Sequence, residues 1–385
     1  MNSRQRIATA LDHREPDRIP LDLGGMAQSC IHCRAYQNLR RHLDLPDRES
    51  RILNQITRAA RMDDDFLERL GIDTLVTYGK WADPEAAEVR EEGRYLAYTD
   101  EWGVGWHMLA DEGYNYAIAS HPLIVEAGAV DEEWNGYQWP DPLHPTRFAG
   151  LREEAQRARD RGKFVVLMGL CPGIVEVYAW LRGYEQFYLD LGSEPDLVRR
   201  FLDKMCELKI AYWLRALDEV GDLVDAINEA DDLAAQDSML WSPEMYRELM
   251  KPYHRRIFDR VKAKAPGVKI LYHSDGAIRP VIPDLIEIGV DILNPIQLNA
   301  AGMDPAGLKR DFGDSLCFWG AGIDVQGILE GASVPEIRDS VKRTIEALAP
   351  GGGFIFAPTT ILGASEPPEK IMAAWEALQD FGTSG

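Results

Sequence analysis

The sequence predicts an α/β protein with the fold of a (β/α)8 TIM barrel. Eight short apolar runs recur along the 385 residues, and a closed parallel barrel contains eight strands. Most of the segments between these runs have helical character, as parallel strands require because their crossover connections are long. Barrels of this length commonly form one domain, so we expect residues 1–385 to be a single domain with an N-terminal extension before the first strand.

The eight predicted strands are short, apolar and bounded by turn residues. Helices between them carry boundary signals: Ser242 is expected to cap a helix that begins at Pro243, and another helix ends before Gly289. A further helix, residues 335–348, stops at Pro350 and the glycines that follow it. In chain order the predicted strands cover residues 19–24, 73–78, 164–169, 223–228, 268–272, 290–295, 316–320 and 353–358.

One connection, residues 80–160, is too long for a simple crossover. Within it, Tyr, Trp and Val alternate with polar residues over residues 88–119, and glycines punctuate the pattern. Alternation of this kind is typical of antiparallel strands joined by tight turns. We therefore expect two or three antiparallel strands that form a lid over one end of the barrel.

Composition excludes several classes of function. The chain has 42 basic and 63 acidic residues, a formal charge of −21, which disfavours a nucleic-acid backbone or an anionic membrane as partner. No window approaches 18 uncharged apolar residues and the amino terminus has no signal-peptide pattern, so we expect a cytoplasmic protein. Five scattered cysteines indicate free thiols, with a zinc or redox role for the Cys30-x-x-Cys33 pair as the alternative.

The most informative stretch is residues 268–276, where a strand runs directly into His273, Asp275 and Gly276. In a barrel of this type the active site lies at the carboxyl ends of the strands, so these side chains are candidates for chemistry. His273 and Asp275 lie two residues apart and would face the same way on a continued strand. The structural alternative is that His273 caps a loop and Asp275 caps the next helix.

Polar residues follow most of the other predicted strands as well. Glu229 and His273 come from adjacent strands, so the pair could bind a divalent metal or act as acid and base. Asp231 and Asp232 could add a ligand or hold a substrate, or could simply cap the following helix. The remaining polar residues at strand ends are Asp22, Tyr78, Cys171, Asn294, Gln297, Asp324, Thr359 and Thr360.

Four segments carry a family resemblance that spans nearly the full chain. They run from SRQR to EPDRIP in residues 3–20, with TDEWG at residues 99–103, YHSDG at 272–276 and GFIFAPT at 353–359. Together they resemble the uroporphyrinogen decarboxylase superfamily, whose members share the (β/α)8 barrel and place their site at its mouth. The chain looks most similar to the branch of corrinoid-linked methyltransferases.

Departures from the family pattern narrow the expected chemistry. The decarboxylase branch carries an amino-terminal Arg-Gln-Ala-Gly-Arg-Tyr segment for substrate carboxylates, and this chain lacks it at its start. Methyltransferases that charge coenzyme M bind zinc through His-x-Cys and a later cysteine. The resemblance aligns His273 with that histidine, but Asp275 replaces the first cysteine and the Thr359-Thr360 region offers no second. It therefore implies a harder zinc site of Glu229, His273 and Asp275 that acts as a Lewis acid.

The resemblance and the residues together predict a methyltransferase of the O-demethylase type. It would remove a methyl group from a small methoxylated compound, aromatic or otherwise, or from another methylated compound. It would pass the methyl group to a corrinoid protein, since the chain has no Asp-x-His-x-x-Gly signature of its own. His273, Glu229 and Asp232 are the predicted catalytic residues. The predicted substrate-binding residues are Asp22, Trp102, Tyr178, Asn294, Gln297 and Thr359.

Several alternatives stay open at this point. Trp102, Trp106 and Tyr178 could line an aromatic pocket or belong to the core. The reaction could instead be a metal-independent decarboxylation or lyase reaction on a small carboxylic acid, or the barrel could be a binding protein without catalysis. The methyl acceptor could be cobalamin or a folate, and a homodimer is the expected assembly.

Overall fold

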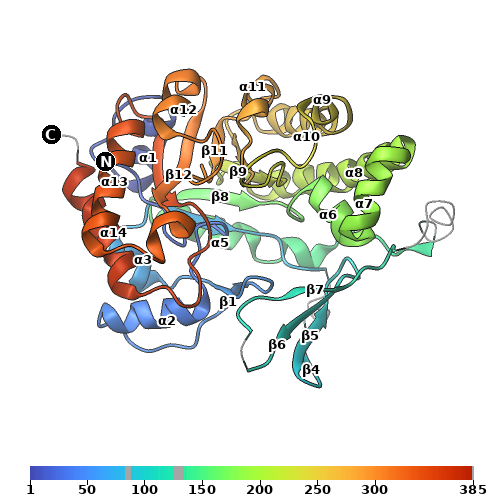
Figure 1. Cartoon of the computed structure of the whole chain (residues 1–385), viewed down its shortest axis with the longest axis horizontal. Helices are drawn as coiled ribbons and strands as arrows, with labels where there is room; N and C mark the ends of the chain where they lie inside the picture. Colours follow the sequence, from blue (N-terminus) through green and yellow to red (C-terminus); the bar gives the residue numbers. More distant parts are fainter. Residues whose placement is uncertain (83–87, 112, 125–133, 135, 384–385) are drawn as a thin grey trace.

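A curled sheet of seven parallel strands forms the centre of the computed structural model, which describes residues 1–82, 88–111, 113–124, 134 and 136–383 (Figure 1). The strand order is β13-β12-β11-β10-β9-β8-β3. Seven of the eight predicted strands are thus confirmed, with ends that shift by a few residues. Their bounds are β3 Thr74–Thr77, β8 Phe164–Met168, β9 Ala226–Ala230, β10 Lys269–His273, β11 Ile292–Asn294, β12 Cys317–Ile323 and β13 Phe354–Pro358.

The remaining predicted strand, residues 19–24 and the first in chain order, is reduced to a single parallel bridge between Leu21 and Phe356 of β13. The segment nevertheless lies between β13 and β3, because the carbonyl oxygen of Leu21 accepts a 2.8 Å hydrogen bond from the backbone N–H of Asp73. Pro20 has no N–H to donate to a ladder, and Gly24 leaves the extended region with φ of 81°. These two residues explain why regular pairing does not extend along the segment.

Strand β9 begins three residues later than predicted. The backbone N–H groups of Leu223 and Val224 both bond the carbonyl oxygen of Val220, so these residues still belong to the turn that ends helix α8. As a consequence the strand runs through Glu229 to Ala230 instead of stopping at Asn228. Glu229 is therefore an interior residue of the strand, and the pleat dictates the side on which it lies.

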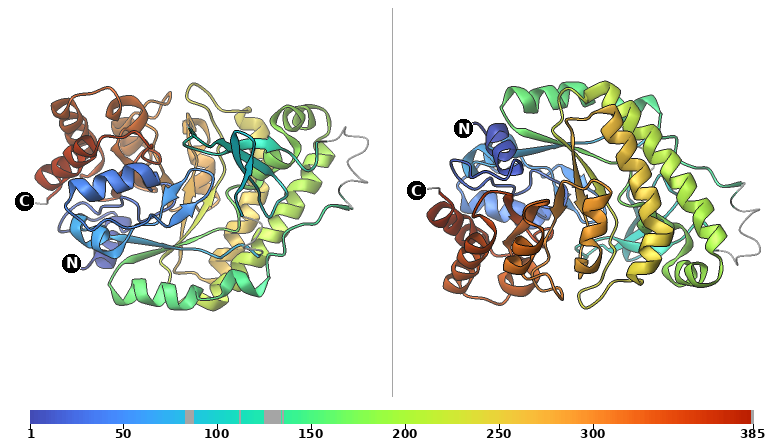
Figure 2. Two further views of the ribbon diagram at one scale, coloured as in Figure 1. Left: turned by 90° about the horizontal axis from the view of Figure 1, so that it is seen from below. Right: turned by 90° about the horizontal axis from the view of Figure 1, so that it is seen from above.

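Helices surround the sheet, and α8 and α10 pack side by side on one flank (Figure 2). Ser242 caps α9 as predicted, with its Oγ accepting from the N–H of Met245 at 3.1 Å, and Pro243 is the first helical residue. Among the described helices, none combines the length and the apolar character that a membrane crossing requires. Their bounds are α1 Ser3–Leu11, α2 Cys33–His42, α3 Asp64–Leu70, α5 Leu151–Asp160, α6 Ile174–Arg182, α7 Tyr184–Ser193, α8 Pro195–Val220, α9 Pro243–Met245, α10 Lys251–Lys264, α11 Ile282–Glu287, α12 Pro305–Phe312, α13 Val334–Leu348 and α14 Pro368–Phe381, with short 3-10 helices at Pro145–Phe148 and Arg279–Val281 and π-helical turns at Tyr246–Met250 and Val325–Leu329.

Alternate residues of the parallel strands fill the inside of the curled sheet. This inner cluster is apolar and includes Phe164 and Val166 of β8, Leu271 of β10 and Trp319 of β12. Ile7 and Leu11 of α1 belong to the same cluster, so the N-terminal helix covers one end of the interior. The other end, where the strands have their carboxyl termini, is left for polar side chains.

The predicted insertion contains a four-stranded antiparallel sheet, one or two strands more than expected (Figure 1). Its turn after β5 is held by buried Asp100, whose carboxylate accepts from the N–H groups of Trp102 and Val104 and from Nε1 of Trp106. The strands are β4 Arg90–Glu92, β5 Tyr95–Thr99, β6 Gly105–Leu109 and β7 Ala117–Ser120, and a smaller sheet before the insertion pairs β1 Ile52–Asn54 with β2 Ala59–Ala60. Residues 83–87, 112, 125–133 and 135 of the predicted insertion lie outside the described part of the chain.

Candidate active site

A cavity of about 330 Å³ opens at the carboxyl ends of β8, β9 and β10. Inward-facing residues of these strands form its wall, among them Asn228 and Ala230 of β9 and His273 of β10. A second cavity of about 510 Å³ extends toward the antiparallel sheet. The two cavities adjoin, because both are lined by Asn54, Ile56, Cys171, Pro172 and Trp180.

His273, the last residue of β10, is held in one orientation by Asn294 of β11. Its Nδ1 lies 2.6 Å from Oδ1 of Asn294, and Nδ2 of Asn294 donates to the carbonyl oxygen of Trp319 at 2.7 Å. Because Nδ2 is committed to that carbonyl, Oδ1 faces the imidazole and accepts its Nδ1–H. The neutral ring then keeps its lone pair on Nε2, the atom available to a metal or a substrate.

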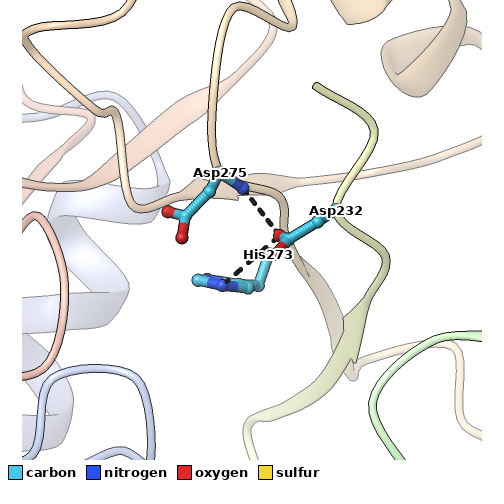
Figure 3. Close-up of side chains that lie close together, drawn as sticks. All are labelled: Asp232, His273 and Asp275. Carbon is cyan, nitrogen blue, oxygen red and sulfur yellow. Dashed lines mark hydrogen bonds and ion pairs between the residues drawn. The ribbon is translucent and has the colours of Figure 1, made fainter. Parts of the chain in front are cut away.

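Asp232 and Asp275 flank this imidazole (Figure 3). Oδ1 of Asp232 lies 4.0 Å from Nε2 of His273 and accepts the backbone N–H of Asp275 at 2.9 Å. One ligand atom from each of Asp232, His273 and Asp275 can be chosen so that all lie within 4.8 Å of one another. An imidazole and two carboxylates form a donor set that suits zinc and other divalent metals.

Oδ1 of Asp275 is buried and has no hydrogen-bond partner among the residues that the structure describes. Burial raises the pKa of this carboxyl group, the Asp232 carboxylate raises it further, and His273 opposes the change. Buried polar atoms are ordinarily paired. An unpaired carboxylate oxygen close to two other possible ligand atoms is one that a bound cation would satisfy. The residues present therefore fit a metal ion.

The loop that presents Asp275 is braced on both sides. Oγ of Ser274 accepts the N–H of Leu233 at 3.0 Å, and the N–H of Gly276 donates to Oε1 of Gln297 at 2.8 Å. Gly276 has φ of 87°, and a Cβ there would lie 2.4 Å from the carbonyl oxygen of Ala234. Only glycine fits this turn, which explains the Asp-Gly sequence after the strand.

Glu229 does not join this group, which corrects the expected Glu229, His273 and Asp275 ligand set. In the parallel register Glu229 pairs with Tyr272, whereas His273 pairs with Ala230, so Glu229 and His273 lie on opposite faces of the sheet. The Glu229 carboxylate is buried against α8, where it forms a 2.8 Å ion pair with Lys209 and accepts from Nε1 of Trp213. The structure replaces Glu229 with Asp232 in the candidate metal site.

Asp231 and Asp232 have different roles: Asp231 is structural, and Asp232 belongs to the candidate metal site. Asp231 is fully buried and accepts the N–H groups of Ile174, Val175 and Glu176 at the start of α6, and Nε2 of His254 lies 2.8 Å from its Oδ2. The expected capping alternative thus applies to Asp231, although the helix it caps is α6 and not the next helix along the chain.

Three predicted substrate-binding residues have structural partners instead. Asp22 is buried inside the sheet, where Thr74 and Nε1 of Trp319 donate to it. Tyr178 is fully buried in the helical layer, donates to Asp190 and stacks on Phe201. Thr359 is buried as well, and its Oγ1 accepts the N–H of Val325.

The other predicted binding residues lie at or near the cavities. Trp102 lines the larger cavity, while Trp106 is buried behind it and packs edge-on against Trp180. Asn294 and Gln297 position other site residues: Asn294 hydrogen bonds to His273, and Gln297 accepts a hydrogen bond from the loop that carries Asp275.

Cys171 is the cysteine that reaches both cavities. Burial raises the pKa of its thiol to about 12, so the group stays protonated near neutral pH and is a poor thiolate ligand. Cys30 and Cys33 lie elsewhere, Cys30 buried with its Sγ 2.8 Å from the carbonyl oxygen of Met26. All five cysteines are free, and the metal-ligand cluster found among the described residues contains none of them.

Sequence reasoning missed Glu176, Gln28 and the inward role of Asn228, all of which line the smaller cavity. Glu176 is the third residue of α6, where burial, together with the carboxylates of Asp232 and Asp231, raises its pKa well above the usual value. Its protonated form is a potential proton donor in the cavity that His273 also lines. Its position in the sequence gives no strand-end signal, because it follows β8 by eight residues and belongs to a helix.

Comparisons with known proteins agree on the fold. Residues 114–381, well over half of the chain, match the family described as uroporphyrinogen decarboxylase (URO-D). A solved methyltransferase from Methanosarcina mazei superposes with a TM-score of 0.66 and 17% identity, over 99% of this chain and 99% of that one. No curated protein sequence matches significantly.

Two xylanases superpose less well, with TM-scores below 0.5. Xylanase B from Clostridium stercorarium F9 gives a TM-score of 0.35 and 13% identity over 56% of this chain and 72% of that one. The catalytic core of a xylanase A gives 0.37 and 12% over 62% of this chain and 85% of that one.

Proposed function

The chain belongs to the uroporphyrinogen decarboxylase family, and from its cavity we propose that it is a methyltransferase of the O-demethylase type. It removes the methyl group of a small methoxylated compound and passes it to a separate corrinoid protein. The observation that carries the proposal is the Asp232, His273 and Asp275 group, a hard donor set in the wall of a substrate-sized cavity. The fold shared with a methyltransferase over 99% of both chains supports it.

Asp232, His273 and Asp275 would hold a divalent ion, for which zinc is the first choice. Three protein ligands leave a fourth position open, as in catalytic zinc sites. A zinc ion bound there would supply Lewis-acid chemistry to an ether oxygen of the substrate. The chain offers no cysteine to this group, which supports an oxygen-bound substrate in preference to the activation of a thiol.

The chain's own residues prepare the leaving oxygen. When the O–CH3 bond breaks, the methyl carbon bonds to the reduced cobalt of the partner and the electron pair of the bond stays on the substrate oxygen. His273, oriented by Asn294, keeps Nε2 available to hold the ion that would meet that oxygen. Glu176 lies in the cavity wall, where burial raises its pKa, and in its protonated form it would deliver the proton that neutralises the alkoxide or phenoxide.

The charge of the cavity weighs against decarboxylation as the main activity. None of the described residues that line the 330 Å³ cavity is Lys or Arg, whereas Glu176 and Asp232 are both present. A carboxylate substrate would meet no cation there other than a bound metal or a protonated His273. Decarboxylation of a small acid is therefore the competing hypothesis, and a binding barrel without catalysis is the third.

Product analysis separates the three hypotheses. The zinc-supplemented protein is incubated with methoxylated phenols and chemically reduced cobalamin, and methylcobalamin is followed by its absorption spectrum. We expect methylcobalamin and the demethylated phenol in equal amounts from the wild type, and neither from the His273→Ala variant. Carbon dioxide from small carboxylic acids without methylcobalamin would establish the lyase, and no product from either panel would favour a binding protein.

The acceptor and the assembly are proposals as well. Tetrahydrofolate offered in place of reduced cobalamin tests the acceptor, and we expect transfer to cobalamin alone. We propose a homodimer, which sedimentation equilibrium tests directly.

A further inference from the structure

A pair of carboxamides beneath His273 presents one unused donor and one unused acceptor to the cavity. Nε2 of Gln28 donates to Oδ1 of Asn228 at 2.7 Å, and both side chains line the cavity. The remaining atoms, Oε1 of Gln28 and Nδ2 of Asn228, are buried and have no partner among the described residues. Asn228 is only 3% exposed, so bulk water does not reach it freely.

The position of the pair relative to His273 follows from the sheet register. Ala230 pairs with His273, and Asn228 precedes Ala230 by two residues on the same face of β9. The carboxamides therefore lie one pleat deeper in the barrel, about 7 Å below the level of His273 at the usual rise of a strand. A ligand whose reacting oxygen meets His273 can reach the pair across one small ring.

We propose that Gln28 and Asn228 bind a free hydroxyl group on the substrate, which makes the substrate a methoxylated phenol. A hydroxyl donates one hydrogen bond and accepts another, so it satisfies Oε1 of Gln28 and Nδ2 of Asn228 together. Rotating both carboxamides by half a turn leaves the same complement of one donor and one acceptor. Trp180, which lines both cavities, supplies an aromatic wall for the ring.

Ethers, carboxylates and ammonium groups complement the pair less well. An ether or a carboxylate has no proton for Oε1 of Gln28, and an ammonium group has no lone pair for Nδ2 of Asn228. Either would leave one buried polar atom without a partner. Sites built in this way reject analogues that lack the matching group.

The inference specifies the substrate of the proposed function, but binding tests it without any corrinoid. Calorimetry compares 4-methoxyphenol with 4-methoxytoluene, which carries a methyl group in place of the hydroxyl, on zinc-supplemented wild-type protein. We expect the phenol to bind at least about 10-fold more tightly. Equal affinities, or no binding of either compound, would overturn the proposal.

Variants locate the source of the preference. Gln28→Met and Asn228→Leu should each bring the two affinities to within about twofold by weakening the phenol alone. Gln156→Met, at an exposed carboxamide on α5, should keep the preference. If Asn228→Leu does not fold, Asn228→Ala removes the donor without a larger apolar side chain and should also lose the preference. Equal weakening of both ligands would indicate a structural role and contradict the assignment.

The outcomes separate this inference from the proposed function. A phenol preference without methylcobalamin formation would retain the hydroxyl site and refute methyl transfer. Methyl transfer from both 4-methoxyphenol and 4-methoxytoluene, bound with equal affinity, would support methyl transfer and refute the hydroxyl site.

Discussion

Nδ1 of His273 donates to Oδ1 of Asn294 across 2.6 Å, and this contact determines which nitrogen of the imidazole faces the cavity. Second-shell partners of this kind commonly change metal affinity by 10- to 100-fold when they are removed. We expect Asn294→Ala to weaken zinc binding by about that factor, because the ring loses its tautomer and its orientation. Competition with a chromophoric chelator measures the change, and Asn38→Ala, at an exposed position on α2, should leave affinity unaltered.

The metal site itself predicts one zinc ion per chain. His273→Ala, Asp232→Asn and Asp275→Asn should each lower the zinc content measured by mass spectrometry after dialysis, because each removes one of three ligands. Exposed His42 provides the control, and His42→Ala should retain the wild-type content. Full zinc in all three site variants would show that the ion, if bound, lies elsewhere.

Substitution of Glu229 should reduce the stability of the protein and leave metal binding unchanged. Both Glu229 and its partner Lys209 are buried, and Glu229→Gln leaves the ammonium without its counter-charge. We expect the free energy of unfolding in urea to fall by about 3–5 kcal/mol, while zinc content stays that of the wild type. The double variant Lys209→Met/Glu229→Gln should recover part of the loss, and Glu207→Gln, at an exposed residue of α8, should have little effect.

Lys209 also connects this ion pair to the cavity. Its Nζ donates to the carbonyl oxygens of Cys171 and Pro172, at 3.2 and 2.6 Å, and both residues line the cavity wall. A zinc loss in Glu229→Gln with unchanged stability would contradict this structural account.

Glu229 and His273 show which features of the site the sequence predicts and which it does not. Both residues were expected at the ends of strands. His273 does end its strand, because the Pro266-Gly267 turn clearly indicates where that strand begins. Glu229 does not, because Leu223 and Val224 look like strand residues but complete the turn after α8. A shift of three residues moved Glu229 from the expected mouth of the barrel into the strand, and the pleat then turned it toward the helices.

Other parts of the site depend on contacts between distant segments, which one sequence does not display. Gln28 follows the segment that takes the place of the first strand, and it meets Asn228 across 200 positions. Glu176 lies at the start of α6, where its backbone N–H donates to the carboxylate of Asp231, which follows β9. The alternation of strands and helices, by contrast, is local information, and it predicted seven strands of the sheet.

Acid stability should depend on Asp17, which closes the N-terminal extension onto α1. The Arg6 guanidinium hydrogen bonds to Asp17 and holds the pKa of that carboxyl well below its usual value near 3.9. A carboxyl group whose pKa is lower in the folded state stabilises the protein at pH values above its unfolded pKa. That stabilisation is lost as the pH falls from the unfolded pKa through the folded pKa. We expect the free energy of unfolding of Asp17→Asn to fall less than that of the wild type between pH 5 and 3. Asp237→Asn, at an exposed site, should follow the wild-type curve; if Asp17→Asn does so too, the ion pair contributes nothing.

Glu176 gives a last prediction that separates chemistry from binding. A protonated carboxyl group and a carboxamide have similar shapes, and both can donate a hydrogen bond, so Glu176→Gln should bind 4-methoxyphenol with nearly wild-type affinity. The amide cannot release a proton to the leaving oxygen, so single-turnover methyl transfer should slow by about 100-fold or more. Stopped-flow absorption of methylcobalamin measures the rate, and Glu185→Gln, at an exposed residue of α7, should be unaffected. An unchanged rate in Glu176→Gln would assign the proton to another donor, whereas a loss of binding with an unchanged rate at saturation would make Glu176 a positioning residue.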